Sequence, residues 1–170
     1  MLRKALIASS LLVLSTSVVA EGGYIGLSAG QTDIDEDGFD KGTSVAITGG
    51  YKFNENFAIE GSYIDLGDSE DNDAPVWTIE ADGFNFSAVG IIPVSETIDI
   101  FGKVGIFMWD VTAYEDGYGE IGSADGTDLS FGFGAAANFT DQFSLVFEYQ
   151  KFDLDDDDAS NISLGARFSF

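Results

Sequence analysis

The last ten residues of the chain, 161–170, constrain the fold more than any other segment. Apolar side chains occupy every second position from Ile162 to Phe170, and polar or small side chains lie between them. This strict alternation predicts a β-strand with one apolar and one polar face. An apolar strand at the edge of an open sheet promotes aggregation. Within a membrane a barrel removes that edge by pairing its last strand with its first, so the segment favours a closed sheet.

Seven further segments show the same alternation, and each ends at a turn signal. The predicted strands are residues 23–31, 44–53, 57–66, 80–92, 98–113, 128–139, 143–152 and 161–170. The clearest is 128–139, where Leu129, Phe131 and Phe133 alternate with small or polar residues. In 98–113 the pattern points Trp109 inward unless a β-bulge resets the register.

The connections between these strands alternate in length and charge. Short turns at 54–56, 93–97 and 140–142 alternate with long acidic loops, which cover residues 32–43, 67–79, 114–127 and 153–160. Aromatic residues gather near the strand ends, as in the interfacial belts of membrane proteins. A barrel in water would turn its apolar face inward, but here the other face is mainly Gly, Ser, Asn and Thr. The sequence therefore predicts an all-β, eight-stranded antiparallel up-and-down transmembrane β-barrel.

Residues 1–20 are predicted to be a secretory signal peptide. Arg3 and Lys4 precede an apolar run over residues 5–14, and small and polar residues lead to Ala20. This order of charge, apolar core and small residue is typical of such signals. The barrel domain is then expected to cover residues 21–170, and export combined with a lipid-facing barrel indicates the outer membrane.

The charge of the chain excludes several classes of function. The sequence has 30 acidic and 7 basic residues, a net charge of −23, and residues 1–20 hold two cations and no acid, so their removal leaves −25. Such a chain is not expected to bind nucleic acid. It contains no His and no Cys, which removes the usual bases and thiol nucleophiles of catalysis. We therefore expect no enzyme and no cofactor.

One local motif is a weak candidate for a metal site. Asp33, Asp35 and Asp37, followed by Gly38, match the first half of a calcium-binding loop. The twelfth position of that motif should be Glu, and here it is Ser44. Divalent cations that screen the acidic loops are therefore expected as partners in preference to one specific calcium site.

Three blocks of sequence go beyond a general barrel pattern. They are FAIEGSYIDLG at 57–67, the segment 84–109 and FSLVFEYQ at 143–150. Together they resemble the membrane domain of the outer membrane protein A family. That resemblance implies contact with outer-membrane lipid and lipopolysaccharide, and assembly by periplasmic chaperones and the barrel-assembly machinery. It also implies that Phe168 and Phe170 form the tag that this machinery reads.

The sequence departs from that family in two respects. The peptidoglycan-binding domain that follows the barrel in full-length members is absent, so no cell-wall tether is expected. Some cations that the family places inside the barrel are replaced by apolar residues, such as Val89 and Val146.

Four charged residues are predicted to form a polar cluster inside the barrel. By the alternation of their strands, Glu60, Lys103, Glu148 and Arg167 point away from the lipid, where a charge near the midplane would cost roughly 2–4 kcal/mol. Enclosed charges are costly unless paired. Glu148 and Arg167 lie on neighbouring strands and are expected to pair directly, whereas Glu60 and Lys103 would reach across the lumen. We expect this cluster to form a polar plug.

These observations support one main interpretation of function and two alternatives. The main one is a structural or surface-interaction barrel that displays acidic extracellular loops. The first alternative is a narrow, porin-like channel for small solutes, although eight strands leave room for little more than side chains. The second is an adhesin that binds its ligand through the loops.

Overall fold

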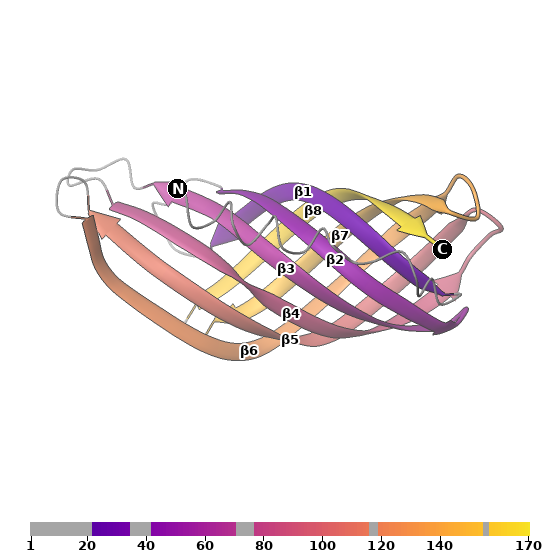
Figure 1. Ribbon diagram of the computed structural model, residues 1–170, viewed down its shortest axis with the longest axis horizontal. Coiled ribbons are helices and arrows are strands. Elements are labelled where there is room, and N and C mark those ends of the chain that lie inside the picture. The colour runs from indigo at the N-terminus through magenta and orange to yellow at the C-terminus, as the bar shows by residue number, and fades with distance from the viewer. Residues whose placement is uncertain (1–21, 35–41, 71–76, 116–118, 155–156) are drawn as a thin grey trace.

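The computed structural model describes residues 22–34, 42–70, 77–115, 119–154 and 157–170, which form one closed barrel (Figure 1). The predicted signal peptide at residues 1–20 lies outside the described residues. All described strands belong to the same sheet. They are β1 (Gly23–Ile34), β2 (Gly42–Asn54), β3 (Phe57–Glu70), β4 (Trp77–Pro93), β5 (Ile98–Glu115), β6 (Gly119–Asn138), β7 (Phe143–Leu154) and β8 (Asp157–Ser169).

Each strand pairs with the next in antiparallel orientation, and β8 pairs with β1 to close the sheet. The eight-stranded up-and-down fold predicted from the sequence is therefore confirmed. In the closing pair, Ile25 lies opposite Phe168 and Leu27 lies opposite Ala166. Within the described ranges, no helix is both long and apolar enough to cross a membrane.

The apolar residues face outward, as the alternation predicts. On β8, Ile162 and Leu164 are each about half exposed, whereas the neighbouring Asn161, on the opposite face of the strand, is buried inside the barrel. An apolar outer wall is stable in lipid and not in water. Trp109 points inward without any bulge, because the pairing of β5 with both neighbours is continuous around it.

Several strands are longer than predicted at the loop end. The largest difference is in β6, which begins at Gly119 and not at residue 128. Residues 119–127 include three glycines and few apolar residues, so they show no apolar alternation. They nevertheless continue the ladder with β5 beyond the apolar band. Sequence alternation reports the lipid contact of a strand, and it ends where that contact ends.

Side-chain caps fix the three short turns. Asn54 Oδ1 accepts hydrogen bonds from the backbone N–H groups of Asn56 and Phe57. The hydroxyl oxygens of Ser95 and Thr140 accept in the same way from Ile98 and Phe143, respectively. Asn, Ser and Thr favour such turns because their side chains satisfy local backbone donors. The strand β1 begins and the strand β8 ends at this side, which we call the turn end (Figure 1). The opposite side is the loop end.

Candidate functional site

The structure places all four charged residues of the predicted polar cluster inside the barrel. The Lys103 ammonium lies 3.1 Å from Glu60 Oε2 and 2.6 Å from Glu148 Oε1. Arg167 Nη2 donates a hydrogen bond to Glu60 Oε1 at 3.1 Å. Two carboxylates and two cations therefore form one continuous network, which we call the ionic cluster. Its opposite charges balance, as a buried group of ions requires.

Glu60 is the centre of the ionic cluster. Besides Lys103 and Arg167, its carboxylate accepts a hydrogen bond from the Tyr24 hydroxyl at 2.8 Å. The guanidinium of Arg167 also lies over the Tyr24 ring, 4.5 Å from its centroid. Tyr24 thus contacts both members of the Glu60–Arg167 pair, and its ring holds the cation in place.

The predicted direct pair between Glu148 and Arg167 is wrong. In the structure Arg167 pairs with Glu60, and Lys103 pairs with both Glu60 and Glu148. The reason is register: Glu148 lies opposite Ser163 on β8, whereas Arg167 lies opposite Ser144 on β7. The two charges are on neighbouring strands but four residues apart along them, which is about 14 Å at the rise of a β-strand.

Glycines in the wall make room for the long side chains of the cluster. The stem of Lys103 crosses β6 at Gly132, where a Cβ atom would lie 3.0 Å from Lys103 Cγ. The Tyr24 ring lies against Gly50, where a Cβ would lie 2.2 Å from the ring. A larger residue at Gly50 would displace Tyr24 from Glu60, so the close approach explains why glycine is present.

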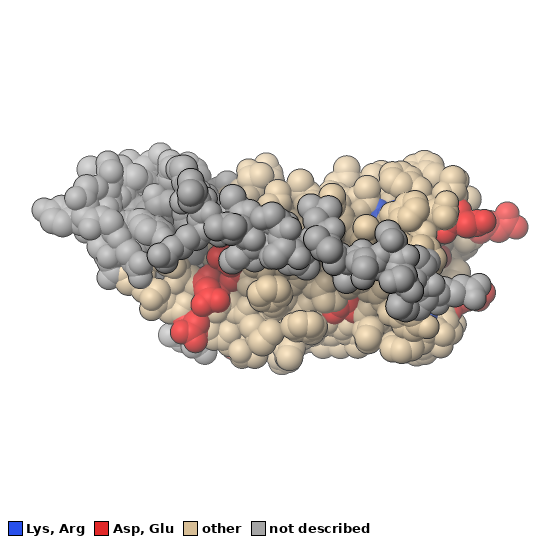
Figure 2. Space-filling view, in the orientation of Figure 1, with Lys and Arg blue, Asp and Glu red and all other residues tan. Residues whose placement is uncertain are grey.

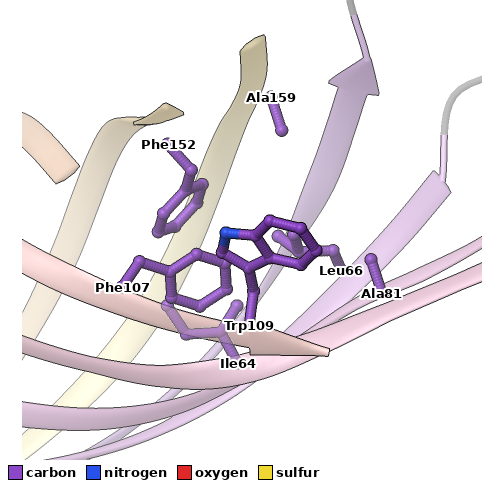
Figure 3. Close-up of a cluster of buried hydrophobic side chains, with 7 residues drawn as sticks. All are labelled: Ile64, Leu66, Ala81, Phe107, Trp109, Phe152 and Ala159. Carbon is purple, nitrogen blue, oxygen red and sulfur yellow. The ribbon is translucent and has the colours of Figure 1, made fainter. Parts of the chain in front are cut away.

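Two apolar layers lie inside the barrel, one on each side of the ionic cluster. The turn-side layer consists of Tyr24, Ala58, Val89, Ile91 and Phe101, with Val146 packed against it. The loop-side layer consists of Ile64, Leu66, Ala81, Phe107, Trp109, Phe152 and Ala159 (Figure 3). The sequence predicted a largely polar interior, so these layers were missed. The inward parity of Phe107, Trp109 and Phe152 is the signal that reveals them.

Neutral hydrogen bonds complete the interior. Ser130 Oγ donates to Asn85 Oδ1 at 2.7 Å, and the Asn85 amide donates to Ser87 Oγ at 3.0 Å. Ser44 Oγ donates to Asn161 Oδ1 at 2.7 Å. These residues come from four strands, β2, β4, β6 and β8, and each bond between strands joins two strands that are separated by a third.

A row of aspartates crosses the outer surface and was not foreseen. Asp65 lies opposite Asp82, Asp82 opposite Asp110, and Asp110 opposite Asp125. All four face outward, directly beyond the apolar residues Tyr63, Phe84 and Met108 of the same strands. Directly opposed side chains have Cβ atoms about 4.5–5.5 Å apart. We call these four residues the aspartate row; Figure 2 shows acidic side chains near the loop end on the face in view.

The weak metal candidates are only partly within the described residues. Asp35 and Asp37 lie outside them, while Asp33 lies on β1 and faces outward. Among the residues that the structure describes, no group of three or more acidic side chains has the arrangement of a metal site. The aspartate row is thus a line of opposed carboxylates and not a chelating cage.

The two aromatic residues of the predicted assembly tag face outward at the turn end. Phe168 lies opposite Ile25 on β1 and opposite Phe143 on β7. The backbone N–H of Phe170 donates to Gly23 O at 3.0 Å, which extends the closing pair by one residue. These rings belong to the belt that also contains Tyr51 and Phe53.

Comparison with known proteins places the barrel in context. The family model for the outer membrane protein beta-barrel domain matches residues 5–170. No curated protein sequence matches the chain. Similar solved structures include Ail, the attachment invasion locus protein of Yersinia pestis, with a TM-score of 0.63, 21% identity, and coverage of 88% of this chain and 100% of that one.

Two further structures share the fold. Neisserial surface protein A has a TM-score of 0.74 and 17% identity, over 88% of this chain and 98% of that one. The N-terminal β-barrel domain of Pseudomonas aeruginosa OprF has a TM-score of 0.59 and 15% identity, over 86% and 97% of the two chains. Ail has also been solved with the heparin analogue sucrose octasulfate.

Proposed function

The chain belongs to the family of outer membrane protein β-barrel domains and is located in the outer membrane, where we propose that it acts as a closed structural barrel with an acidic surface for interactions. The observation that carries this proposal is the ionic cluster. Glu60 and Lys103 are buried, Glu148 and Arg167 are largely so, and the four charges balance and pair with one another inside a narrow lumen. Such an interior stabilises a wall and leaves no wide aqueous path.

The narrow-channel alternative has less support. A conducting lumen needs a continuous polar path, whereas here apolar layers lie on both sides of the ionic cluster. The test is the current through the unmodified protein in a planar lipid bilayer. We expect rare, small openings or none. A large steady conductance would contradict the closed barrel and support the channel.

For the outer surface, we propose that divalent cations are the partners of the aspartate row. Like charges placed directly opposite each other across strands destabilise a sheet. A divalent cation near two such carboxylates relieves that repulsion. The row lies directly beyond the apolar band, where we expect the phosphate groups of lipopolysaccharide to lie. A cation shared between a carboxylate and a phosphate would therefore link the barrel to the surrounding leaflet.

The positions of the basic residues limit the kinds of ligand that this chain could bind as an adhesin. Ail was solved with a polysulfated ligand, and such a ligand requires exposed cations. In the described part of this chain, Lys103 and Arg167 are enclosed in the lumen, Lys52 stands apart at the turn end of β2, and Lys151 at the loop end pairs with Asp158 at 2.5 Å. We therefore expect no binding of sucrose octasulfate. A surface partner, if one is found, would be cationic.

We further propose that Phe168 and Phe170 form the tag through which chaperones and the barrel-assembly machinery handle the chain. Their outward position leaves both rings accessible before the strand closes against β1. Replacing Phe170 by Asp should reduce the amount of heat-modifiable protein in the outer-membrane fraction. The matched control is Ser169→Asp, which introduces the same charge next to Phe170 but on the inward face of β8. Equal assembly of Phe170→Asp and unmodified protein would contradict the tag.

A further inference from the structure

A small polar cavity lies inside the barrel between the ionic cluster and the loop-side layer. Its volume is about 50 Å³, and its walls include Thr48, Ser62, Gln150 and Asn161, with Lys103 and Glu148 of the ionic cluster. Ile64 of the loop-side layer also contributes to the wall. A water molecule needs only about 10–15 Å³ of space measured in this way. We call this cavity the polar chamber.

The groups around the polar chamber are suited to water. Gln150 is 4% exposed, and its Nε2 has no hydrogen-bond partner among the described residues. Beyond the residues of that wall, the hydroxyl of Thr32, which is 2% exposed, also has no hydrogen-bond partner among the described residues. Thr32 and Gln150 lie on either side of Asn161 in the strand register. Buried polar groups without protein partners are usually bonded to water, so the polar chamber can hold water.

The loop-side layer has the opposite character. Its side chains come from β3, β4, β5, β7 and β8 and converge within the lumen (Figure 3). Phe107 and Phe152 are fully buried, and their ring centroids lie 4.4 Å apart although β6 separates their strands. The two rings thus meet in front of β6, on the inner face of the wall. The polar side chains opposite the two rings, Asn85 and Ser130, are hydrogen-bonded to each other, so water at this level would find few free partners.

Glycines again permit this closure. A Cβ atom at Gly83 would lie 2.7 Å from the Phe107 ring, and one at Gly126 would lie 2.5 Å from the Trp109 indole. The indole is oriented further by its hydrogen bond to Asp128, at 2.6 Å. The wall is therefore shaped around the rings, which pack closely against it.

We infer that the loop-side layer, and not the ionic cluster, is the element that seals the lumen from the outside. The ionic cluster borders a chamber that accepts water, and its task is to stabilise the wall. Apolar constrictions block ions by excluding water, and the loop-side layer is such a constriction. This inference rests on the proposed function as a closed barrel and specifies which residues close it.

Cysteine accessibility tests the seal, because the chain contains no native cysteine. Thr48→Cys places a single thiol in the wall of the polar chamber, and its reaction with a charged methanethiosulfonate reagent is followed in detergent micelles. In the otherwise unmodified barrel we expect slow labelling. With Phe107→Ala and Phe152→Ala added, labelling should be at least about tenfold faster, since a tenfold change corresponds to about 1.4 kcal/mol in the barrier. The single Phe152→Ala variant, which removes less of the layer, should give a smaller increase.

Two controls separate the seal from general loosening and from the ionic cluster. The outward-facing pair Phe86→Ala and Phe131→Ala removes the same atoms from the lipid face and should leave the labelling rate unchanged. Lys103→Met disrupts the ionic cluster, and in barrels shown to be folded it should raise the labelling rate less than the inner phenylalanine variants do. Equal labelling with and without the inner phenylalanines, in barrels shown to be folded by gel mobility, would overturn the inference. So would faster labelling in Lys103→Met than in the phenylalanine variants.

The proposed function fails by a different observation. A large steady current through the unmodified protein would contradict the closed barrel itself. A silent unmodified barrel in which the inner phenylalanines do not affect labelling would contradict only the assignment of the seal.

Discussion

The ionic cluster and the aspartate row solve opposite electrostatic problems on the two sides of one sheet. Inside, two carboxylates and two cations are enclosed and joined by contacts of 2.6–3.1 Å. Outside, four carboxylates lie opposite one another, and Asp110 and Asp125 in the row are exposed to solvent. The wall of the barrel therefore separates a balanced set of charges from an unbalanced one.

The difference follows from the cost of burial. A charge in a narrow lumen cannot be hydrated fully, so an opposite charge must be present. A charge at the outer rim keeps its water, and repulsion between neighbours costs only a fraction of a kcal/mol per pair. Unbalanced negative charge is thus tolerated at the outer rim.

The largest expected effect comes from removing the cation at the centre of the inner network. Lys103→Met keeps the stem that crosses Gly132 but leaves Glu60 and Glu148 without their shared partner. Breaking a buried ion pair on one side costs about 3–5 kcal/mol, so we expect a loss of that size in the free energy of unfolding. Urea-induced unfolding in lipid vesicles measures it.

A matched pair at the rim provides the control for that loss. Asp158→Ala breaks the contact with Lys151. The side chain of Asp158 is 40% exposed and that of Lys151 is 46% exposed. Exposed pairs contribute about 0.2–1 kcal/mol. If both variants lost the same free energy, burial would not be the cause of the difference between the two regions.

Double-mutant cycles sharpen the description of the inner cluster. Alanine replacements of Glu60 and Arg167, which are in contact, should show a coupling of about 1–3 kcal/mol. The same cycle for Glu148 and Arg167 should show much less, because their only connection passes through Glu60 and Lys103. The reverse order would indicate that the sequence-based pair was correct and that the register of β7 with β8 is different.

The smallest expected effect concerns the aspartate row. Millimolar calcium should stabilise the unmodified barrel, and magnesium should do nearly the same if the ions only screen repulsion. Asp110→Asn removes the charge that faces both Asp82 and Asp125, so it should reduce this response. Thermal unfolding with and without each ion measures the change, and Glu55→Gln in a short turn is the control. A response unaltered by Asp110→Asn would place the cations elsewhere.

Much of the fold could be predicted because contact with lipid requires an apolar residue at every second position of a strand. Phe131, Phe133 and Phe147 need only parity to be placed on the outer face, and parity also put Glu60 and Lys103 inside. The strand ends could not be predicted in this way. Residues 119–127 pair with β5 beyond the lipid, where neither face has to be apolar.

The contacts of the site depend on the register between strands, which the sequence of one strand does not determine. Parity puts Arg167 inside but does not say whether it faces Glu148 or Glu60. In the same way, Asp65, Asp82, Asp110 and Asp125 are recognisable as outward residues one at a time. They form a row only because three successive strand pairs are aligned at that level.

The most direct test of this account compares one neutralised carboxylate from each region under the same conditions. Glu60→Gln and Asp110→Asn each remove one negative charge with almost no change in shape, and the free energy of unfolding of both is measured without divalent cations. We predict opposite signs: Glu60→Gln should destabilise the barrel by several kcal/mol, and Asp110→Asn should stabilise it by about 0.2–1 kcal/mol. A change of the same sign in both variants would contradict the claim that the wall separates paired charges from repelling ones.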